Sequence, residues 1–221
     1  MWVELAVIIV LLIIIILIGV PDPQNVYLTS DTYDSLEKFE EEKELQEIVD
    51  EVSKLQPDTW KSHPDMMLWK NDTIKKEMAD KWTIFPLMIN NNWMAKNCEM
   101  VPKLTAMLKE IPDVESASLT ALDSKSQLEP YCGWAELSND SLRSHMLLTK
   151  DKDETSGLII GTDTTYYEYG KWTTYDDSVL HSEINTSAKR RIVLAIDLPR
   201  PSNISSGSSP NSFKAGPQTK K

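Results

Sequence analysis

The sequence predicts a mainly β domain of the jelly-roll sandwich or barrel type, with flanking helices and an apolar segment ahead of it. From residue 142 onward, short runs rich in β-branched and aromatic residues recur, separated by Asp, Ser, Gly and Lys. That pattern is typical of short strands joined by turns. The chain has 221 residues, of which 41% are hydrophobic. It is therefore long enough to bury one good core.

Residues 1–20 are predicted to form an uncleaved membrane anchor that contacts the bilayer through residues 2–20. Residues 5–20 are all apolar or glycine, and Glu4 alone interrupts the run that starts at Trp2. A helix of this length can cross a hydrocarbon core. A secretory signal peptide is the alternative, but no Lys or Arg precedes the run and no small-residue cleavage site precedes Pro21.

Residues 21–80 are predicted to form an acidic helical stalk followed by a packing strap. Residues 31–55 carry ten acidic side chains and three lysines. Apolar residues recur there at helical spacing, at Leu36, Phe39, Leu45, Ile48 and Val52. This helix is either a partner-binding or calcium-attracting stalk, or an amphipathic helix that packs on the domain or pairs with itself. The apolar stretch that follows, which includes His63, is read as packing and loop.

The β domain is predicted to span residues 81–201. Strands are expected at 81–87, 117–122, 142–148, 157–161, 164–169, 172–175 and 191–198, and a helix at 102–109. Residues 202–221 are rich in Ser, Gly, Pro and Asn and are predicted to be disordered. From residue 57 onward the charges nearly balance, with 22 acidic and 20 basic residues. This balance argues against a nucleic-acid partner.

The candidate site centres on His181 and Arg191. Arg191 opens the apolar run 192–196, which is typical of a strand buried on both faces. A guanidinium at the start of such a strand needs an anion. Residues 185–189 have the composition of a turn. We therefore expect His181 and Arg191 on adjacent strands, within reach of one small molecule; the alternative is that both face solvent.

Six stretches, in chain order, resemble a known family. They are WTIFPL at 82–87, NCEMVPKLT at 97–105, IP at 111–112, LEPYCG at 128–133, LRSHMLL at 142–148, and the region 175–201, which begins YDDS and ends DLPRP. Together they are similar to the aspartyl/asparaginyl β-hydroxylase family over roughly residues 81–201. The resemblance implies a double-stranded β-helix, a cupin-like jelly roll.

The resemblance also implies two cofactors, Fe(II) and 2-oxoglutarate, because members of this family are dioxygenases that use both. Two histidines hold the iron, and an arginine clamps the distal carboxylate of 2-oxoglutarate in a bidentate contact. By position, the second histidine is His181 and the clamp is Arg191, and these two are the implied catalytic residues. The implied cofactor-binding residues are Arg191, Arg143, His145, Thr120 and Trp82.

The chain departs from the family at the first metal-ligand histidine, whose position is occupied by Tyr131. A phenol has an ordinary pKa of about 10, and the anionic oxygen favours iron(III) over iron(II). Tyr131 is therefore a doubtful ligand. Cys132 is not a ready substitute, because neighbouring side chains on a strand point to opposite faces. Asp177, four residues before His181, is either an alternative oxygen ligand or a structural acid.

Two functions follow from the resemblance. One is a membrane-anchored dioxygenase that hydroxylates a peptidyl Asp, Asn or similar residue of a protein substrate. The other is a catalytically impaired relative that keeps the 2-oxoglutarate-type pocket as a binding module. A jelly-roll binding domain unrelated to the family is a third possibility.

Four glycosylation sequons bear on localisation; they begin at Asn71, Asn139, Asn185 and Asn203. Together with the resemblance, they favour a single-pass type II protein with its domain in the lumen of the secretory pathway or outside the cell. Charge adds little, because the first basic residue after the apolar run is Lys38.

Overall fold

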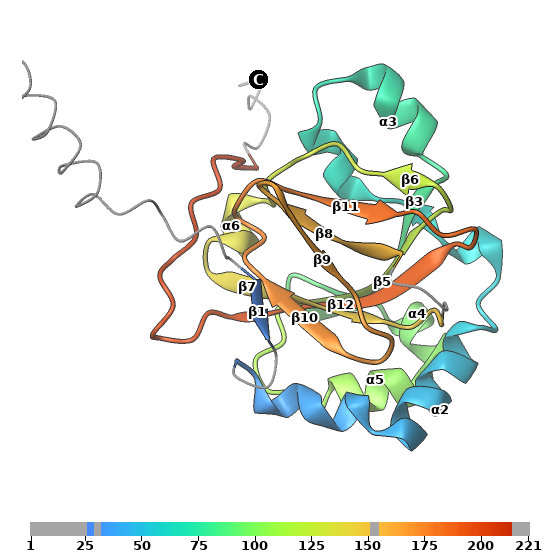
Figure 1. Cartoon of the computed structure of the whole chain (residues 1–221). Helices are drawn as coiled ribbons and strands as arrows, with labels where there is room; N and C mark the ends of the chain where they lie inside the picture. Colours follow the sequence, from blue (N-terminus) through green and yellow to red (C-terminus); the bar gives the residue numbers. More distant parts are fainter. Residues whose placement is uncertain (1–25, 29–31, 151–154, 214–221) are drawn as a thin grey trace, which may run out of the picture.

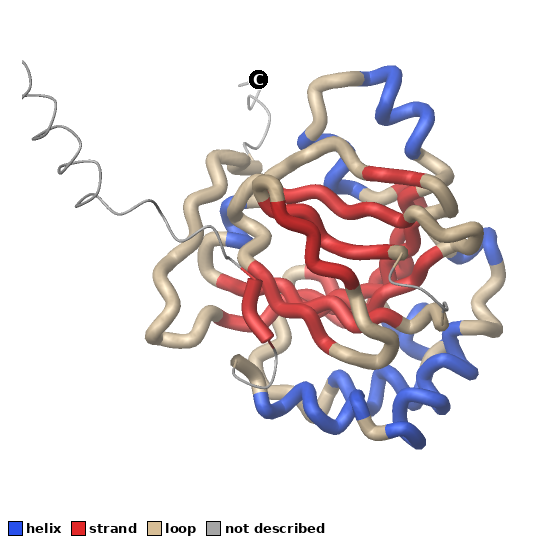
Figure 2. Tube along the Cα trace, viewed as in Figure 1, coloured by secondary structure: helices blue, strands red, loops and turns tan. Residues whose placement is uncertain are grey.

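A computed structural model describes residues 26–28, 32–150 and 155–213 of the chain. The predicted anchor at residues 1–20 lies outside this part. Among the described helices, none is long and apolar enough to span a membrane. Two antiparallel sheets face each other, and helices cover the outer face of the larger sheet (Figures 1 and 2). The prediction of a mainly β fold with flanking helices is confirmed.

The described residues form an eight-stranded sheet and a four-stranded sheet. The large sheet has the order β1-β10-β7-β12-β5-β3-β2, and β4 pairs with β3. Its strands are β1 (Val26–Leu28), β2 (Lys61–Ser62), β3 (Trp82–Ile89), β4 (Asn92–Trp93), β5 (Ser116–Leu122), β7 (Ser141–Leu147), β10 (Trp172–Tyr175) and β12 (Arg191–Pro199). The small sheet has the order β6-β11-β8-β9 and consists of β6 (Ser126–Gln127), β8 (Ser156–Ile160), β9 (Asp163–Tyr166) and β11 (His181–Asn185). From β5 to β12 the chain passes back and forth between the two sheets, as in a double-stranded β-helix.

Helices pack on both sides of the large sheet: those of residues 34–52 and 95–108 cover its outer face, and those of residues 64–78 pack beside Trp82 on its inner face. The helical elements are η2 (Asp34–Glu40), α2 (Glu42–Val52), η3 (Pro57–Thr59), η4 (Pro64–Leu68), α3 (Asp72–Met78), α4 (Ala95–Met100), α5 (Pro102–Leu108) and α6 (Ala135–Ser138). Leu36, Phe39 and Ile48 are buried in one core cluster with Leu194 and Ile196 of β12. Of the two interpretations of the acidic helix, the packing one is therefore correct, and residues 34–52 are part of the domain.

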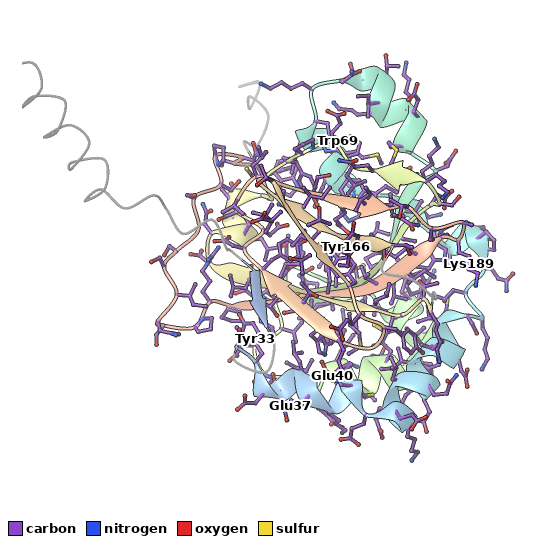
Figure 3. All side chains as sticks on the ribbon, in the orientation of Figure 1. Tyr33, Glu37, Glu40, Trp69, Tyr166 and Lys189 are labelled. Atoms are coloured by element: carbon purple, nitrogen blue, oxygen red, sulfur yellow. The ribbon has the colours of Figure 1, made fainter. Side chains whose placement is uncertain are left out.

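The acidic helix is also attached to the sheet by polar contacts. Glu40 lies at the end of η2 and is labelled in Figure 3. Its carboxylate accepts hydrogen bonds from Lys171 Nζ at 2.7 Å and from the backbone N–H of Trp172 at 3.2 Å. The predicted single helix is in fact broken at Glu41, whose backbone is extended.

Strand alternation decides which side chains reach the space between the sheets. Successive residues of a strand point to opposite faces, so one face of β12 carries Ile192, Leu194 and Ile196 into the helix-covered core. The other face carries Arg191 and Asp197 inward. The same rule directs other polar side chains of the large sheet inward, namely Thr120, Arg143 and His145. The fold thus places these polar side chains in the space between the two sheets.

The chain after β12 turns back along α6. Ser209 donates through its backbone N–H to Asn139 Oδ1 at 2.7 Å and through its hydroxyl to the Gly133 carbonyl. The Asn211 side chain donates to the Cys132 carbonyl at 2.7 Å. Residues 202–213 form no helix or strand, as their composition predicts. They are nevertheless hydrogen-bonded to the domain, so the prediction of disorder is wrong for this segment. Residues 214–221 lie outside the described part.

Candidate active site

A cavity of about 550 Å³ opens between the inner face of the large sheet and the segment that holds η4. Five residues that the sequence predicted for the site line it: Trp82, Thr120, Tyr131, Arg143 and His145. Its other lining residues include His63, Asp65, Met67, Ile89, Trp134, Glu183, Asp197 and Phe213. The convergence of these five on one cavity follows from their places on β3, β5, β7 and the segment before α6.

His181 and Tyr131 face each other across an isolated antiparallel bridge. Each backbone N–H donates to the other's carbonyl, at 2.9 and 3.0 Å, and the rings lie 4.4 Å apart. Since a directly opposed pair shares one face, both side chains point into the sandwich. Burial, followed by the charge of Asp177, raises the pKa of the Tyr131 phenol well above its ordinary value. Tyr131 therefore remains a neutral phenol.

The imidazole of His181 has one nitrogen in use. Its Nδ1 lies 2.8 Å from the Val179 carbonyl and donates to it, which leaves a lone pair on Nε2. Nε2 is buried without a hydrogen-bond partner among the described residues. Its nearest carboxylate oxygen is Asp177 Oδ1, at 3.4 Å. Of the two interpretations of Asp177, placement beside this nitrogen is consistent with an oxygen ligand.

Arg143 holds two carboxylates in place. Its Nε and Nη2 donate to both oxygens of Asp197, at 2.8 and 3.2 Å, and its Nη1 donates to Asp177 Oδ1 at 2.9 Å. Burial raises the pKa of Asp177 to about 7, against the lowering effect of Arg143. Arg143 thus positions Asp177, and its donors are already engaged.

Arg191 is more completely buried than Arg143 and pairs with Glu183. The two charged groups are in contact, with 2% and 3% of their side chains exposed. Burial raises the pKa of Glu183, but Arg191 and then His145 lower it to about 2. The predicted adjacency of His181 and Arg191 is wrong: β11 belongs to the small sheet and β12 to the large one. The two side chains point inward from opposite layers, with Glu183 beside Arg191.

Of three further side chains predicted for the site, one has a hydrogen-bond partner and two have none among the described residues. His145 Nδ1 lies 3.0 Å from the Tyr167 hydroxyl. By contrast, Thr120 Oγ1 and Trp82 Nε1 are buried without hydrogen-bond partners among the described residues. Both residues line the cavity. Unpaired buried polar atoms are rare in proteins, so these two are available to a bound ligand.

Sequence reasoning missed His63 and Asp65. His63 stacks on Trp82 with ring centres 3.9 Å apart, and Asp65 Oδ1 accepts a hydrogen bond from Trp134 Nε1 at 2.9 Å. The aperiodic stretch around them carried no positional signal. Glu183 was also missed, but a signal existed, because on a strand it shares the face of His181.

Acidification is expected to lower the melting temperature by more than about 5 °C between about pH 6.5 and pH 4. Burial lowers the pKa of His63 and of His181 to about 4 and that of His145 to about 3. The unfolded chain therefore binds more protons in this window, and stability is lost as pH falls. Burial raises the pKa of Asp177 and of Glu115, so these two carboxyls act in the opposite direction, but Glu115 is only partly buried and the three buried histidines outweigh the pair. Calorimetry across this range checks the prediction, and a melting temperature that rises on acidification contradicts it.

Comparisons with known proteins identify the family. The profile described as Aspartyl/Asparaginyl beta-hydroxylase matches residues 42–201. A search of curated proteins finds no match.

Two solved structures are similar to this chain. An oxidoreductase of the 2OG-Fe(II) oxygenase family from Burkholderia pseudomallei is 11% identical, with a TM-score of 0.48 over 77% of this chain and 82% of that one. A prolyl hydroxylase from Trichoplax adhaerens, solved with a hypoxia inducible factor peptide fragment, is 8% identical, with a TM-score of 0.49 over 72% and 79%.

The profile match covers more than half of the sequence, including every residue predicted for the site. The chain belongs to the aspartyl/asparaginyl β-hydroxylase family and, by that membership, to the class of 2-oxoglutarate-dependent dioxygenases.

Proposed function

We propose that the protein is a membrane-anchored hydroxylase that acts on a peptidyl Asp, Asn or similar side chain. The observation that carries this proposal is the free lone pair of His181 Nε2, buried beside Asp177 behind the cavity wall. The cavity supports a peptide substrate, because exposed apolar side chains line it at Met67, Ile89 and Phe213. The unpaired donors of Trp82 and Thr120 would bind polar groups of that peptide.

His181 and Asp177 are the residues that would hold iron(II). The described residues contain no group of three His, Cys, Asp or Glu side chains arranged for a metal. Two protein ligands are nevertheless the number that the family resemblance implies. Charge favours a cation as well, because four buried carboxylates (Asp65, Asp177, Glu183 and Asp197) accompany two guanidinium groups, those of Arg143 and Arg191. The chemistry supplied by bound iron(II) and 2-oxoglutarate is insertion of one atom of dioxygen into a substrate C–H bond, with succinate and carbon dioxide as co-products.

The test is an anaerobic iron(II) titration of the full-length protein, followed by an oxygenation assay that detects a peptide mass gain of one oxygen atom. His181→Ala and Asp177→Asn are expected to lose iron binding and product together. His63→Gln, which alters a buried histidine stacked on Trp82, is the matched control and should keep iron binding. Iron binding that survives in His181→Ala would place the metal elsewhere and overturn the proposal.

A second candidate function is a binding module without turnover. It is favoured by one contact, that of Glu183 with Arg191, because the guanidinium that would clamp 2-oxoglutarate already holds a carboxylate. Tyr131 at the position of the family's first histidine supports the same alternative. Peptide binding with neither iron binding nor product would select this function.

Membrane anchoring through residues 2–20 and a lumenal or extracellular domain are part of the proposal. The sequons provide a test, because Asn71 and Asn203 are exposed. Asn185 is fully buried, and its side-chain amide donates to three carbonyls. Asn139 exchanges hydrogen bonds with Ser209.

Expression in a secretory host is therefore expected to glycosylate Asn71 and Asn203 and to leave Asn139 and Asn185 unmodified. Gel mobility before and after glycosidase treatment of Asn→Gln variants measures this. Glycan on Asn185 of the folded protein would contradict the prediction, and absence of glycan at all sites would contradict a lumenal domain.

A further inference from the structure

A buried ion pair joins the two sheets of the sandwich. Glu183 extends inward from β11 of the small sheet, and Arg191 extends inward from the first residue of β12 of the large sheet. Glu183 Oε2 contacts Arg191 Nη1, and the same oxygen lies 3.9 Å from His145 Nδ1. The Arg191 guanidinium also lies over the Tyr167 ring, 5.6 Å from its centre. The carboxylate is therefore held by one cationic group, the Arg191 guanidinium, and is buried away from water.

This pairing leaves Arg191 incompletely satisfied. Its Nε and Nη2 are buried and have no hydrogen-bond partner among the described residues. A guanidinium presents a rigid fork of donors that matches both oxygens of one carboxylate. Glu183, approaching from the opposite sheet, engages one nitrogen of that fork. The remaining donors are available to a carboxylate that approaches in a bidentate manner.

Glu183 lies between the cavity and Arg191. Glu183 lines the cavity, and Arg191 is not among its lining residues. A ligand that enters from the cavity mouth therefore meets the Glu183 carboxylate before it meets the guanidinium. Two carboxylates at one guanidinium repel each other, so the ligand's anionic end reaches Arg191 when Glu183 moves aside.

We propose that Glu183 holds one nitrogen of the Arg191 guanidinium and that its charge opposes the binding of dicarboxylate ligands to the free Nε and Nη2 of that group. The inference rests on the proposed function for the natural ligand, 2-oxoglutarate. The competition itself needs neither metal nor turnover. An attached carboxylate has a high effective concentration at its partner, so a free dicarboxylate binds weakly unless Glu183 is removed.

The experiment is calorimetric titration of the full-length protein with succinate, a dicarboxylate without a keto group. Glu183→Ala, which removes the competing charge and opens space, is expected to bind succinate at least about tenfold more tightly than the wild type. Glu183→Gln removes the charge at nearly constant volume and should gain affinity in the same direction. Adding Arg191→Gln to either variant should abolish the gain. The matched control is Glu136→Gln, which removes another cavity-lining carboxylate and should leave affinity unchanged.

If Glu183→Ala or Glu183→Gln is less stable than the wild type, a thermal-shift measurement still tests the inference, because each variant is compared with itself with and without succinate. Succinate should raise the melting temperature of Glu183→Ala, whereas the uncharged diamide succinamide should not. Equal succinate affinity in wild type, Glu183→Ala and Glu183→Gln, together with no thermal shift, overturns the inference. Because the readout is succinate binding without metal, this failure is distinguishable from a failure of hydroxylation.

Discussion

Replacing Tyr131 by histidine is expected to raise the affinity for iron(II) by at least about tenfold, because it adds a neutral nitrogen donor beside His181. Tyr131 and His181 are directly opposed across a backbone bridge, with their rings 4.4 Å apart on one face. A histidine there places a second imidazole beside the free Nε2 of His181. Burial keeps the present phenol protonated, so the wild type lacks this second strong donor.

The measurement is an anaerobic iron(II) titration of the wild type and of Tyr131→His. Tyr131→Phe is the control, because it removes the hydroxyl and keeps the ring; it should bind iron(II) no better than the wild type. Equal affinity in the wild type and Tyr131→His would mean that position 131 is not aligned with the family's first ligand. His181 and Asp177 would then remain the only assigned iron(II) ligands in both proteins.

Replacing Arg143 by methionine is expected to lower the free energy of unfolding by about 3–5 kcal/mol, because it leaves buried carboxylates without their partner. Arg143 donates to both oxygens of Asp197 and to Asp177, and its side chain is 13% exposed. Urea denaturation measures the change. Arg143→Lys keeps the charge and loses the planar fork, so it should fall between the wild type and Arg143→Met.

The control for Arg143 is Lys171→Met, which breaks an ion pair with Glu40 at the surface. Exposed ion pairs contribute little to stability, so this change should be much smaller. A loss in Arg143→Met no larger than in Lys171→Met would show that Asp177 and Asp197 are stabilised by other groups. It would also remove the assigned positioning role of Arg143 beside His181.

The site residues that sequence could predict are those on regular strands. Alternation along β5 and β7 turns Thr120, Arg143 and His145 to one side, and the positions of the strands were predicted to within two or three residues. A period-2 pattern, once placed on the correct strand, fixes which face a side chain occupies. The pattern did not select these three residues, which the family resemblance implied; it explains why they share one face.

The errors arose where long-range pairing decides the outcome. The turn composition of residues 185–189 correctly predicts a connection between two strands, but the strands that it joins belong to different sheets. Local composition does not say whether a connection stays in one sheet or crosses to the other. His63 and Asp65 reach the cavity because η4 packs over Trp82, a contact that their own sequence does not encode.

The return of residues 202–213 along α6 has a consequence for how the domain is delimited. The family match ends at residue 201, yet Ser209 and Asn211 cap carbonyls of Gly133 and Cys132, next to Tyr131. A fragment cut at the end of the match would expose those carbonyls and lose Phe213 from the cavity lining. The segment that matches the family and the segment that builds the pocket thus have different C-terminal limits, and the smallest piece that retains a complete pocket extends at least to Phe213.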